Sequence, residues 1–173
     1  MNENKAIYYF GYGSNMSTDY LINRRKVVPL KSEKAVLNDY KLIMNMEGPN
    51  FLEPSFANIK EEEGSYVEGI LHKIHKDDLK KIVNTEGENY QLVDLSVKTE
   101  QCTRKSCSLI YLTDQIKDIP SSKRYLTILI NAAKKSNLSE DYIKSLEKRP
   151  YIYYPVLSEL FSIRVYLWVW FRT

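Results

Sequence analysis

The sequence contains few of the residues that build disulfide frameworks and metal sites. Its 173 residues include two cysteines and two histidines. Four residues separate Cys102 from Cys107, and neither has a Cys or His partner at zinc-site spacing, so we expect free thiols. His72 and His75 are three residues apart in a predicted strand, where side chains alternate in direction, so they are expected to face opposite sides. The sequence therefore predicts no bound metal.

A charge excess of one sign is absent as well. The 25 Lys and Arg residues nearly balance the 22 Asp and Glu residues, and the net charge is +3. Basic residues are spread along the chain without the clustered stripe that nucleic-acid binding needs, so no nucleic-acid partner is expected. The first residues are polar and lack the apolar core of a signal peptide, which favours a cytoplasmic protein. The length favours a single domain over residues 1–173.

Long uncharged apolar runs are missing, although the aromatic-rich segment at residues 151–173 comes close. It holds eight aromatic residues, including both tryptophans. Charges at Glu159, Arg164 and Arg172 interrupt it, and no stretch is long enough for a bilayer-spanning helix, so no membrane partner is expected. The favoured interpretation of residues 163–173 is a terminal strand buried on the core. A homodimer interface is the main alternative, and membrane association is the least favoured one.

The most informative pattern is a strand that runs into a glycine-rich loop. Residues 6–10 are short, apolar and rich in aromatic side chains, which predicts a buried strand. Gly11 and Gly13 then allow a ligand to approach the backbone, and consecutive N–H groups beside Ser14 and Asn15 predict an anion site. The third glycine of a dinucleotide loop and the Gly-Lys-Ser/Thr of a phosphate loop are both absent, so a carboxylate is the favoured anion. A glycine turn between a strand and a helix would explain the same residues without a ligand.

Apolar residues at helical spacing, together with capping residues, predict four helices. They begin after Ser17, at Lys76, after Ser122 and after Ser139. The charges of Arg24 and Arg25 suit the end of the first helix and are interpreted as structural. Gly87 is the predicted stop of the second helix, and the fourth should end before Pro150.

Extended segments are predicted at residues 6–10, 27–30, 35–46, 56–59, 66–74, 90–97 and 107–112. Asn38 and Asp39 indicate a turn within the third of these. The acidic residues 61–64, which end in a glycine, indicate a hairpin turn. Residues 47–55, with two prolines, predict an irregular loop that could border a pocket.

Glu86 is the candidate for acid–base chemistry. It lies in the last turn of the second predicted helix, where the negative end of the helix dipole disfavours the ionised form and suits proton transfer near neutrality. Tyrosine hydroxyls could help to orient a polar ligand. A solvated surface carboxylate is the simpler interpretation of this glutamate.

Several motifs together resemble the γ-glutamylcyclotransferase family, which includes AIG2-like proteins. They are YFGYGSNM at residues 9–16, ANI at 57–59, VEGIL at 67–71, EG at 86–87 followed by Tyr90, and the helical stretch 125–138. Their order and spacing also match, and the similarity extends over residues 6–150. The Tyr-Gly-Ser-Asn element is the most specific of them.

The resemblance implies an α+β fold, a small mixed and partly closed β-barrel flanked by helices, with a pocket that needs no metal or other cofactor. It also implies that a small-molecule γ-glutamyl substrate cyclises to 5-oxoproline and releases a free amine. The site residues carried over are Glu86 as the catalytic acid and base, and Gly11, Tyr12, Gly13, Ser14, Asn15, Tyr90 and Tyr125 as substrate-binding residues.

The identity of the released amine stays open. The substrate is a γ-glutamyl amino acid, a γ-glutamylamine or a glutamyl conjugate of a biosynthetic intermediate. The leaving-amine side would be built from variable segments such as residues 46–55 and the aromatic tail, which departs from the family pattern. A hypothesis of a different class is a catalytically silent module that binds a small ligand, and the presence of Glu86 argues against it.

Overall fold

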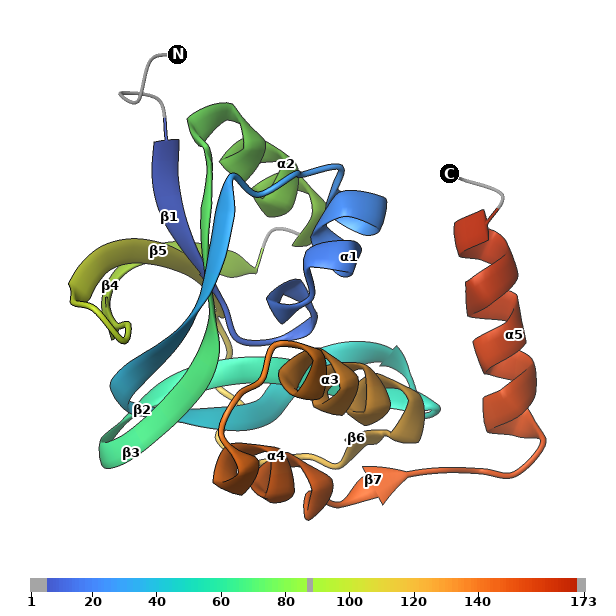
Figure 1. Cartoon of the computed structure of the whole chain (residues 1–173). Helices are drawn as coiled ribbons and strands as arrows, with labels where there is room; N and C mark the ends of the chain where they lie inside the picture. Colours follow the sequence, from blue (N-terminus) through green and yellow to red (C-terminus); the bar gives the residue numbers. More distant parts are fainter. Residues whose placement is uncertain (1–5, 87–88, 171–173) are drawn as a thin grey trace.

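The strands form a closed five-stranded barrel (Figure 1). The computed structural model describes residues 6–86 and 89–170. The strands are β1 Ala6–Gly11, β2 Lys31–Asn50, β3 Glu53–His75, β4 Tyr90–Lys98 and β5 Thr103–Tyr111. They close in the order β1-β3-β2-β4-β5, with antiparallel ladders and one parallel contact, between β1 and β5. The expected mixed barrel with flanking helices is confirmed.

Two long strands, β2 and β3, pair along their whole length and form the main hairpin, with 20 and 23 residues. The register of the ladder shifts beside Asp39, which has a left-handed φ of 59°, and Gly64 has a φ of 75°. The Gly64 amide donates a hydrogen bond to Asp39 Oδ1 at 3.0 Å. The turn predicted at residues 38–39 and the hairpin predicted at 61–64 are therefore wrong, because both signals mark one bend in a continuous pair of strands.

The predicted irregular loop at residues 47–55 is also wrong. β2 continues to Asn50 and β3 starts at Glu53, so a two-residue turn joins them. Gly48 permits this tight end of the hairpin, because a Cβ at this position would lie 1.7 Å from the Glu53 carbonyl oxygen. The same turn buries the Glu53 side chain.

The helical segments lie outside the strands (Figure 1). They are η2 Ser14–Met16, α1 Thr18–Tyr20, the π-helix η3 Leu21–Arg25, α2 Lys76–Glu86, α3 Lys123–Lys135 and α4 Glu140–Glu147. The short strands β6 Ser121–Ser122 and β7 Tyr151–Ile152 pair in parallel. The predicted caps are confirmed, because the hydroxyl oxygens of Ser17, Ser122 and Ser139 each accept a backbone N–H three residues later. The predicted helix stop at Gly87 lies outside the described residues.

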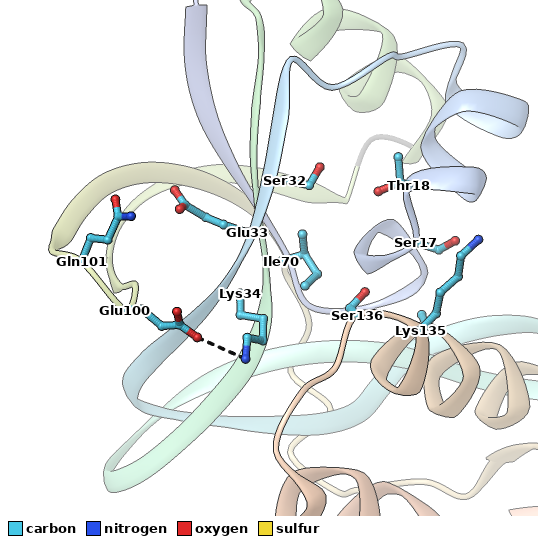
Figure 2. Close-up of a pocket in the computed structure, with 11 residues that line it drawn as sticks. Ser17, Thr18, Ser32, Glu33, Lys34, Ile70, Glu100, Gln101, Lys135 and Ser136 are labelled. Carbon is cyan, nitrogen blue, oxygen red and sulfur yellow. Dashed lines mark ion pairs between the residues drawn. The ribbon is translucent and has the colours of Figure 1, made fainter.

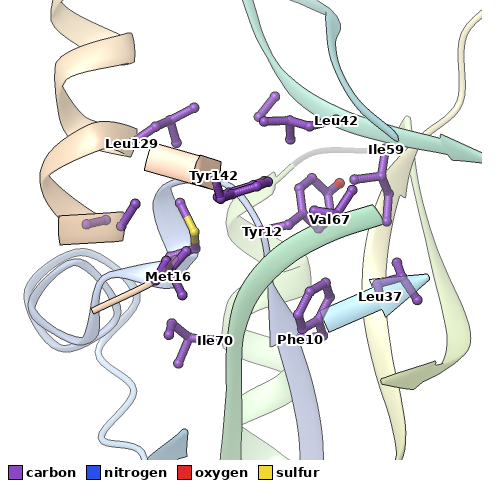
Figure 3. Close-up of a cluster of buried hydrophobic side chains, with 14 of the residues drawn as sticks. Phe10, Tyr12, Met16, Leu37, Leu42, Ile59, Val67, Ile70, Leu129 and Tyr142 are labelled. Carbon is purple, nitrogen blue, oxygen red and sulfur yellow. The ribbon is translucent and has the colours of Figure 1, made fainter. Parts of the chain in front are cut away.

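Two clusters of buried apolar side chains connect the barrel to its helices. The larger cluster packs Leu129 of α3 and Tyr142 of α4 over barrel residues such as Phe10 (Figure 3). The smaller cluster packs Leu21 of η3 and Ile82 of α2 against Tyr9 of β1 and further barrel residues. Because each fully buried side chain of this kind contributes about 1.5–3 kcal/mol, this packing fixes the ends of η3 and α2 beside β1.

The C-terminal segment is a helix, so the predicted terminal strand is wrong. Helix α5 Leu157–Trp170 stands beside the body of the molecule and follows Val156, which has a left-handed φ of 70° (Figure 1). Leu160 and Ile163 are more than half exposed, so this segment is not buried on the core. An apolar run without clear periodicity does not distinguish a helix from a strand, although Glu159 in the first turn suits a helix start. Among the residues that the structure describes, no helix is both long and apolar enough to cross a membrane.

His72 connects the barrel to the glycine-rich loop. Its ring is fully buried, with Nε2 at 2.9 Å from the Asn15 carbonyl oxygen and Nδ1 at 2.8 Å from Ser32 Oγ. A carbonyl oxygen accepts only, so Nε2 donates to Asn15 and Nδ1 accepts from the Ser32 hydroxyl. Burial lowers the pKa of His72 to about 4, and the ring is therefore neutral at physiological pH.

We expect His72 to make the protein sensitive to acid. An unfolded His72 binds a proton below pH 6.5 that the folded ring binds only near pH 4. The stability of the neutral ring is thus fully present above pH 6.5 and is lost as the pH falls to about 4, by about 3 kcal/mol in all. Urea unfolding at pH 7 and pH 4.5 should show a smaller pH-dependent loss for His72→Gln than for the wild type. Equal losses would contradict this assignment.

Candidate active site

A narrow recess of about 40 Å³ lies at the end of β1. Its walls come from β1, the glycine-rich loop, β3, α2, β4, β5 and α3. The residues that line it are Tyr9, Tyr12, Gly13, Ser14, Asn15, Ala57, Glu86, Tyr90, Leu109 and Tyr125. Segments far apart in the sequence therefore meet around one small polar cavity.

The structure brings seven of the eight sequence-predicted site residues together at this recess. They are Tyr12, Gly13, Ser14, Asn15, Glu86, Tyr90 and Tyr125. Gly11 is not among the residues that line the recess. It lies beneath the loop, where a Cβ would be 2.6 Å from the Asn15 carbonyl oxygen. A glycine at this position therefore lets the loop fold back over the strand.

Glu86 is held by two donors on the same carboxylate oxygen. Oε1 accepts a hydrogen bond from Asn15 Nδ2 at 2.9 Å and a second one from Arg25 Nη2. The two charged side chains form an ion pair and are only 14% and 11% exposed, for Glu86 and Arg25 respectively. The carboxylate is thus fixed through one oxygen by an amide and by a positively charged group.

Arg25 is a site residue that the sequence analysis missed. The interpretation of its charge as a structural helix-end feature is incomplete, because its guanidinium contacts three groups of the site. Nε donates to Asn15 Oδ1 at 3.3 Å, Nη1 donates to the Thr85 carbonyl oxygen at 3.1 Å, and Nη2 binds Glu86. The π-helical turn of η3 presents the arginine to the end of α2, and a sequence pattern of basic residues does not indicate such a turn.

Buried tyrosines surround the carboxylate. Burial, and then the Glu86 charge, raise the pKa of Tyr9 and of Tyr90 well above the ordinary value. Burial also raises the pKa of Tyr125, and the Ala57 amide opposes this rise in part. These phenols are therefore neutral near pH 7.

The hydroxyls of these tyrosines differ in their hydrogen bonds. Tyr12 Oη donates to the Leu109 carbonyl oxygen, and Tyr90 Oη donates to Met46 Sδ. Tyr125 Oη accepts the Ala57 N–H at 3.2 Å, and its own O–H has no acceptor among the described residues. Tyr125 can therefore donate a hydrogen bond to a ligand in the recess.

The recess opens into a groove of about 670 Å³. Ser14, Glu86, Tyr90 and Tyr125 line both cavities and form their boundary. Farther out the groove is lined by Tyr20, Met46, Phe56 and Ile128 and, from α5, by Ser162, Val165 and Tyr166. Residues of the two segments expected at the leaving-amine side, 46–55 and the C-terminal segment, line this groove; their part in binding an amine stays a prediction.

The outer groove also contains a buried ion pair that the sequence analysis did not anticipate. Glu53 Oε1 accepts hydrogen bonds from Arg124 and from Ser122 Oγ, the latter at 2.9 Å. The Glu53 side chain is 4% exposed, whereas that of Arg124 is 29% exposed and reaches the groove. The pairing of residues 53 and 124 depends on the barrel topology, which no local pattern reveals.

A second cleft, of about 440 Å³, lies on another face and holds none of the predicted site residues (Figure 2). Its charged groups pair with one another or with neighbours, for example Lys34 with Glu100 at 3.2 Å and Lys135 with Asp19. Within residues 6–86 and 89–170 no group of three or more His, Cys, Asp or Glu side chains is arranged to hold a metal ion. The recess is therefore the candidate active site.

Comparison with known proteins shows which family the chain is similar to. The model of the AIG2-like family matches residues 66–146. The gamma-glutamyl cyclotransferase gliK of Claviceps purpurea (strain 20.1) is 29% identical over 171 residues, which cover 91% of this chain and 77% of that protein. The gamma-glutamylcyclotransferase of Bos taurus is 27% identical over 150 residues, which cover 83% of this chain and 79% of that protein. The chain is therefore similar to members of the γ-glutamylcyclotransferase, or AIG2-like, family.

The fold agrees with that of the family. A solved structure named gamma-glutamyl cyclotransferase aligns with a TM-score of 0.76 at 22% identity, over 87% of this chain and 92% of that one. The segment that matches the family model includes Glu86, Tyr90 and Tyr125, whereas the glycine-rich loop precedes it.

We expect Gly11→Ala to destabilise the protein by about 1–3 kcal/mol, because its Cβ would meet the Asn15 backbone at 2.6 Å and force the loop away. Gly13→Ala is the matched comparison, since its Cβ would meet only side-chain atoms, at 3.3 Å and 3.5 Å, and the loss should be smaller. Thermal or urea unfolding of both variants measures the difference. Equal losses would show that the close packing at Gly11 is unimportant.

Proposed function

We propose that this protein is a γ-glutamylcyclotransferase, which converts a γ-glutamyl compound into 5-oxoproline and a free amine. Relatives that carry this name support the proposal. The observation that carries it is the position of Glu86, whose carboxylate lies at the boundary of recess and groove beside the glycine-rich loop. A glutamyl group that is folded over at this boundary would contact both the Glu86 carboxylate and the glycine-rich loop.

The loop is the proposed binding site for the α-carboxylate of the substrate. Gly13 and Ser14 precede and begin the short helical turn η2, and the first amides of such a turn have no partner within it. The recess is only a few water molecules in volume, which suits a small anionic group. Anchoring the α-carboxylate there would leave the α-amine and the γ-carbonyl at the level of Glu86.

The reaction needs no external nucleophile. Glu86 takes a proton from the α-ammonium group, the amine nitrogen attacks the γ-carbonyl carbon, and a C–N bond forms with the negative charge on the carbonyl oxygen. When this intermediate collapses, the bond to the leaving nitrogen breaks, and Glu86 returns the proton to that nitrogen. The Glu86 carboxylate then takes the second proton from the new ring nitrogen and passes it to the released amine, so that neutral lactam and an ammonium ion leave. Proton transfer of this kind contributes about 10²- to 10⁴-fold, and orientation of the two ends of one molecule adds several kcal/mol.

Tyr125 is the proposed donor to the oxygen that becomes negative. Its O–H has no acceptor among the described residues, and its oxygen is held by the Ala57 amide. A fixed donor in a site from which water is largely excluded stabilises a developing charge better than water does.

The leaving amine is proposed to lie in the outer groove, among apolar side chains and the Glu53–Arg124 pair. An amino acid, a peptide and a larger amine all fit a groove of about 670 Å³. Formation of 5-oxoproline from γ-glutamyl-alanine, from glutathione and from γ-glutamyl-ε-lysine tests the proposal and ranks these classes. No product from any of the three would favour the ligand-binding module.

We expect Glu86→Gln to abolish the release of 5-oxoproline, because the amide cannot accept the proton of the α-ammonium group. The variant should still fold and bind a γ-glutamyl ligand, as measured by calorimetry. Glu140→Gln, at an exposed position of α4, is the control and should retain full activity. Normal turnover by Glu86→Gln would remove Glu86 from the mechanism.

We expect Tyr125→Phe to lower kcat by about 10²-fold, the usual effect of removing one donor to a developing oxyanion. KM should change little, because this hydrogen bond strengthens only as the charge develops. Steady-state kinetics with γ-glutamyl-alanine measures both constants. A rise in KM at constant kcat would instead make Tyr125 a ground-state binding residue.

A further inference from the structure

Arg25 was not among the predicted site residues, yet its guanidinium contacts three groups of the candidate site. We propose that Arg25 is a positioning residue for the proposed cyclisation: together with Asn15 it holds one oxygen of Glu86 and leaves the other to exchange the proton with the substrate. This inference rests on the proposed function and adds a residue to it.

The contacts of Arg25 fix the orientation of the Asn15 amide. A guanidinium can only donate, so the Asn15 atom that meets Arg25 Nε at 3.3 Å is the carbonyl oxygen Oδ1. The amide nitrogen Nδ2 then points the other way, to Glu86 Oε1 and to Tyr9 Oη, each at 2.9 Å. Without Arg25, the amide could rotate and present its oxygen to the carboxylate, which would be repulsive.

The two oxygens of Glu86 have different environments. Both donors contact Oε1. Oε2 accepts no hydrogen bond from the part of the chain that the structure describes, although the side chain lines the recess and the groove. Oε2 is therefore the atom that can take a proton, and the position of Oε1 determines where Oε2 lies.

Arg25 also determines the electrostatic environment of the carboxylate. The titratable groups around Glu86 include Tyr9 on β1, Tyr12 in the glycine-rich loop, Tyr90 on β4 and Tyr125 on α3. Burial raises the pKa of all four phenols and keeps them neutral. Arg24 adds a second cation on the groove wall, and Arg25 forms an ion pair with Glu86. The guanidinium of Arg25 thus places a positive charge directly against the carboxylate.

A lysine cannot reproduce this arrangement. The three nitrogens of Arg25 bind Asn15, Thr85 and Glu86 at the same time. An ammonium group supplies the same charge from a single atom, without the planar fork that spans these acceptors. Charge and geometry can therefore be separated by comparing two substitutions.

The test measures kcat, KM and the pH dependence of kcat/KM for γ-glutamyl-alanine in full-length Arg25→Met and Arg25→Lys. For Arg25→Met we expect kcat to fall about 100-fold, the scale of a small misplacement of a reacting group, with a smaller change in KM. The acidic limb of its pH profile should move to higher pH, because the carboxylate loses the positive charge that favours its ionised form. Arg25→Lys should keep that limb near the wild-type position and still lose about 10-fold in kcat.

Arg149 provides a matched control. Its side chain is 17% exposed, and its guanidinium also binds one carboxylate, that of Asp118, and one backbone carbonyl, that of Leu42. It is not among the residues that line the recess or the groove. Arg149→Met should lose stability and keep both the wild-type kcat and the wild-type pH profile.

The outcomes separate this inference from the proposed function. A wild type that forms no 5-oxoproline from any substrate tested refutes the proposed function, and the role of Arg25 falls with it. The inference on Arg25 alone is overturned by a different set of results. In that case the wild type is active and Glu86→Gln is inactive, but Arg25→Met keeps the wild-type kcat and the acidic limb of its pH profile does not move. Loss of folding in both Arg25 variants would make the arginine a structural residue and would also overturn it.

Discussion

A carboxylate that is largely removed from water needs hydrogen-bond donors from the protein, and this requirement organises the candidate site. Glu86 accepts hydrogen bonds from the Asn15 amide in the glycine-rich loop and from the Arg25 guanidinium in the π-helix. These donors lie 71 and 61 residues away in the sequence. The loop, the π-helix and the end of α2 must therefore be correctly placed at the same time, and the packing of the barrel achieves this.

A single strand serves both the core and the site. Successive side chains of β1 point in opposite directions, so Phe10 enters the larger apolar cluster while Tyr9 enters the smaller one. The Tyr9 ring packs beside η3 and α2, and its hydroxyl meets Asn15 at the wall of the recess. The packing that stabilises the fold is thus directly connected to the polar groups that hold Glu86.

Local patterns in the sequence predict the parts of the site that are local in the structure. The glycine-rich loop follows from its turn residues, and the caps at Ser17, Ser122 and Ser139 are where the pattern places them. Arg25 and Glu53 could not be found in this way, because their roles depend on partners brought close by the barrel and by an unusual π-helical turn.

The errors in the fold predicted from the sequence have similar causes. The residues around Asp39 and Gly64 are good turn formers, yet each is used for the same bend of a long hairpin, and only the pairing of the two strands reveals this. The aromatic tail has no periodicity that separates helix from strand, so its conformation follows from context that the sequence does not display.

The two cavities have separate structural origins. The recess is built entirely from the barrel, α2, α3 and the loop at the end of β1, whereas the far wall of the groove includes Ser162, Val165 and Tyr166 of the final helix. That helix is attached through a short connection at Val156. Changes confined to this terminal helix would therefore reshape the groove and leave the residues of the recess untouched.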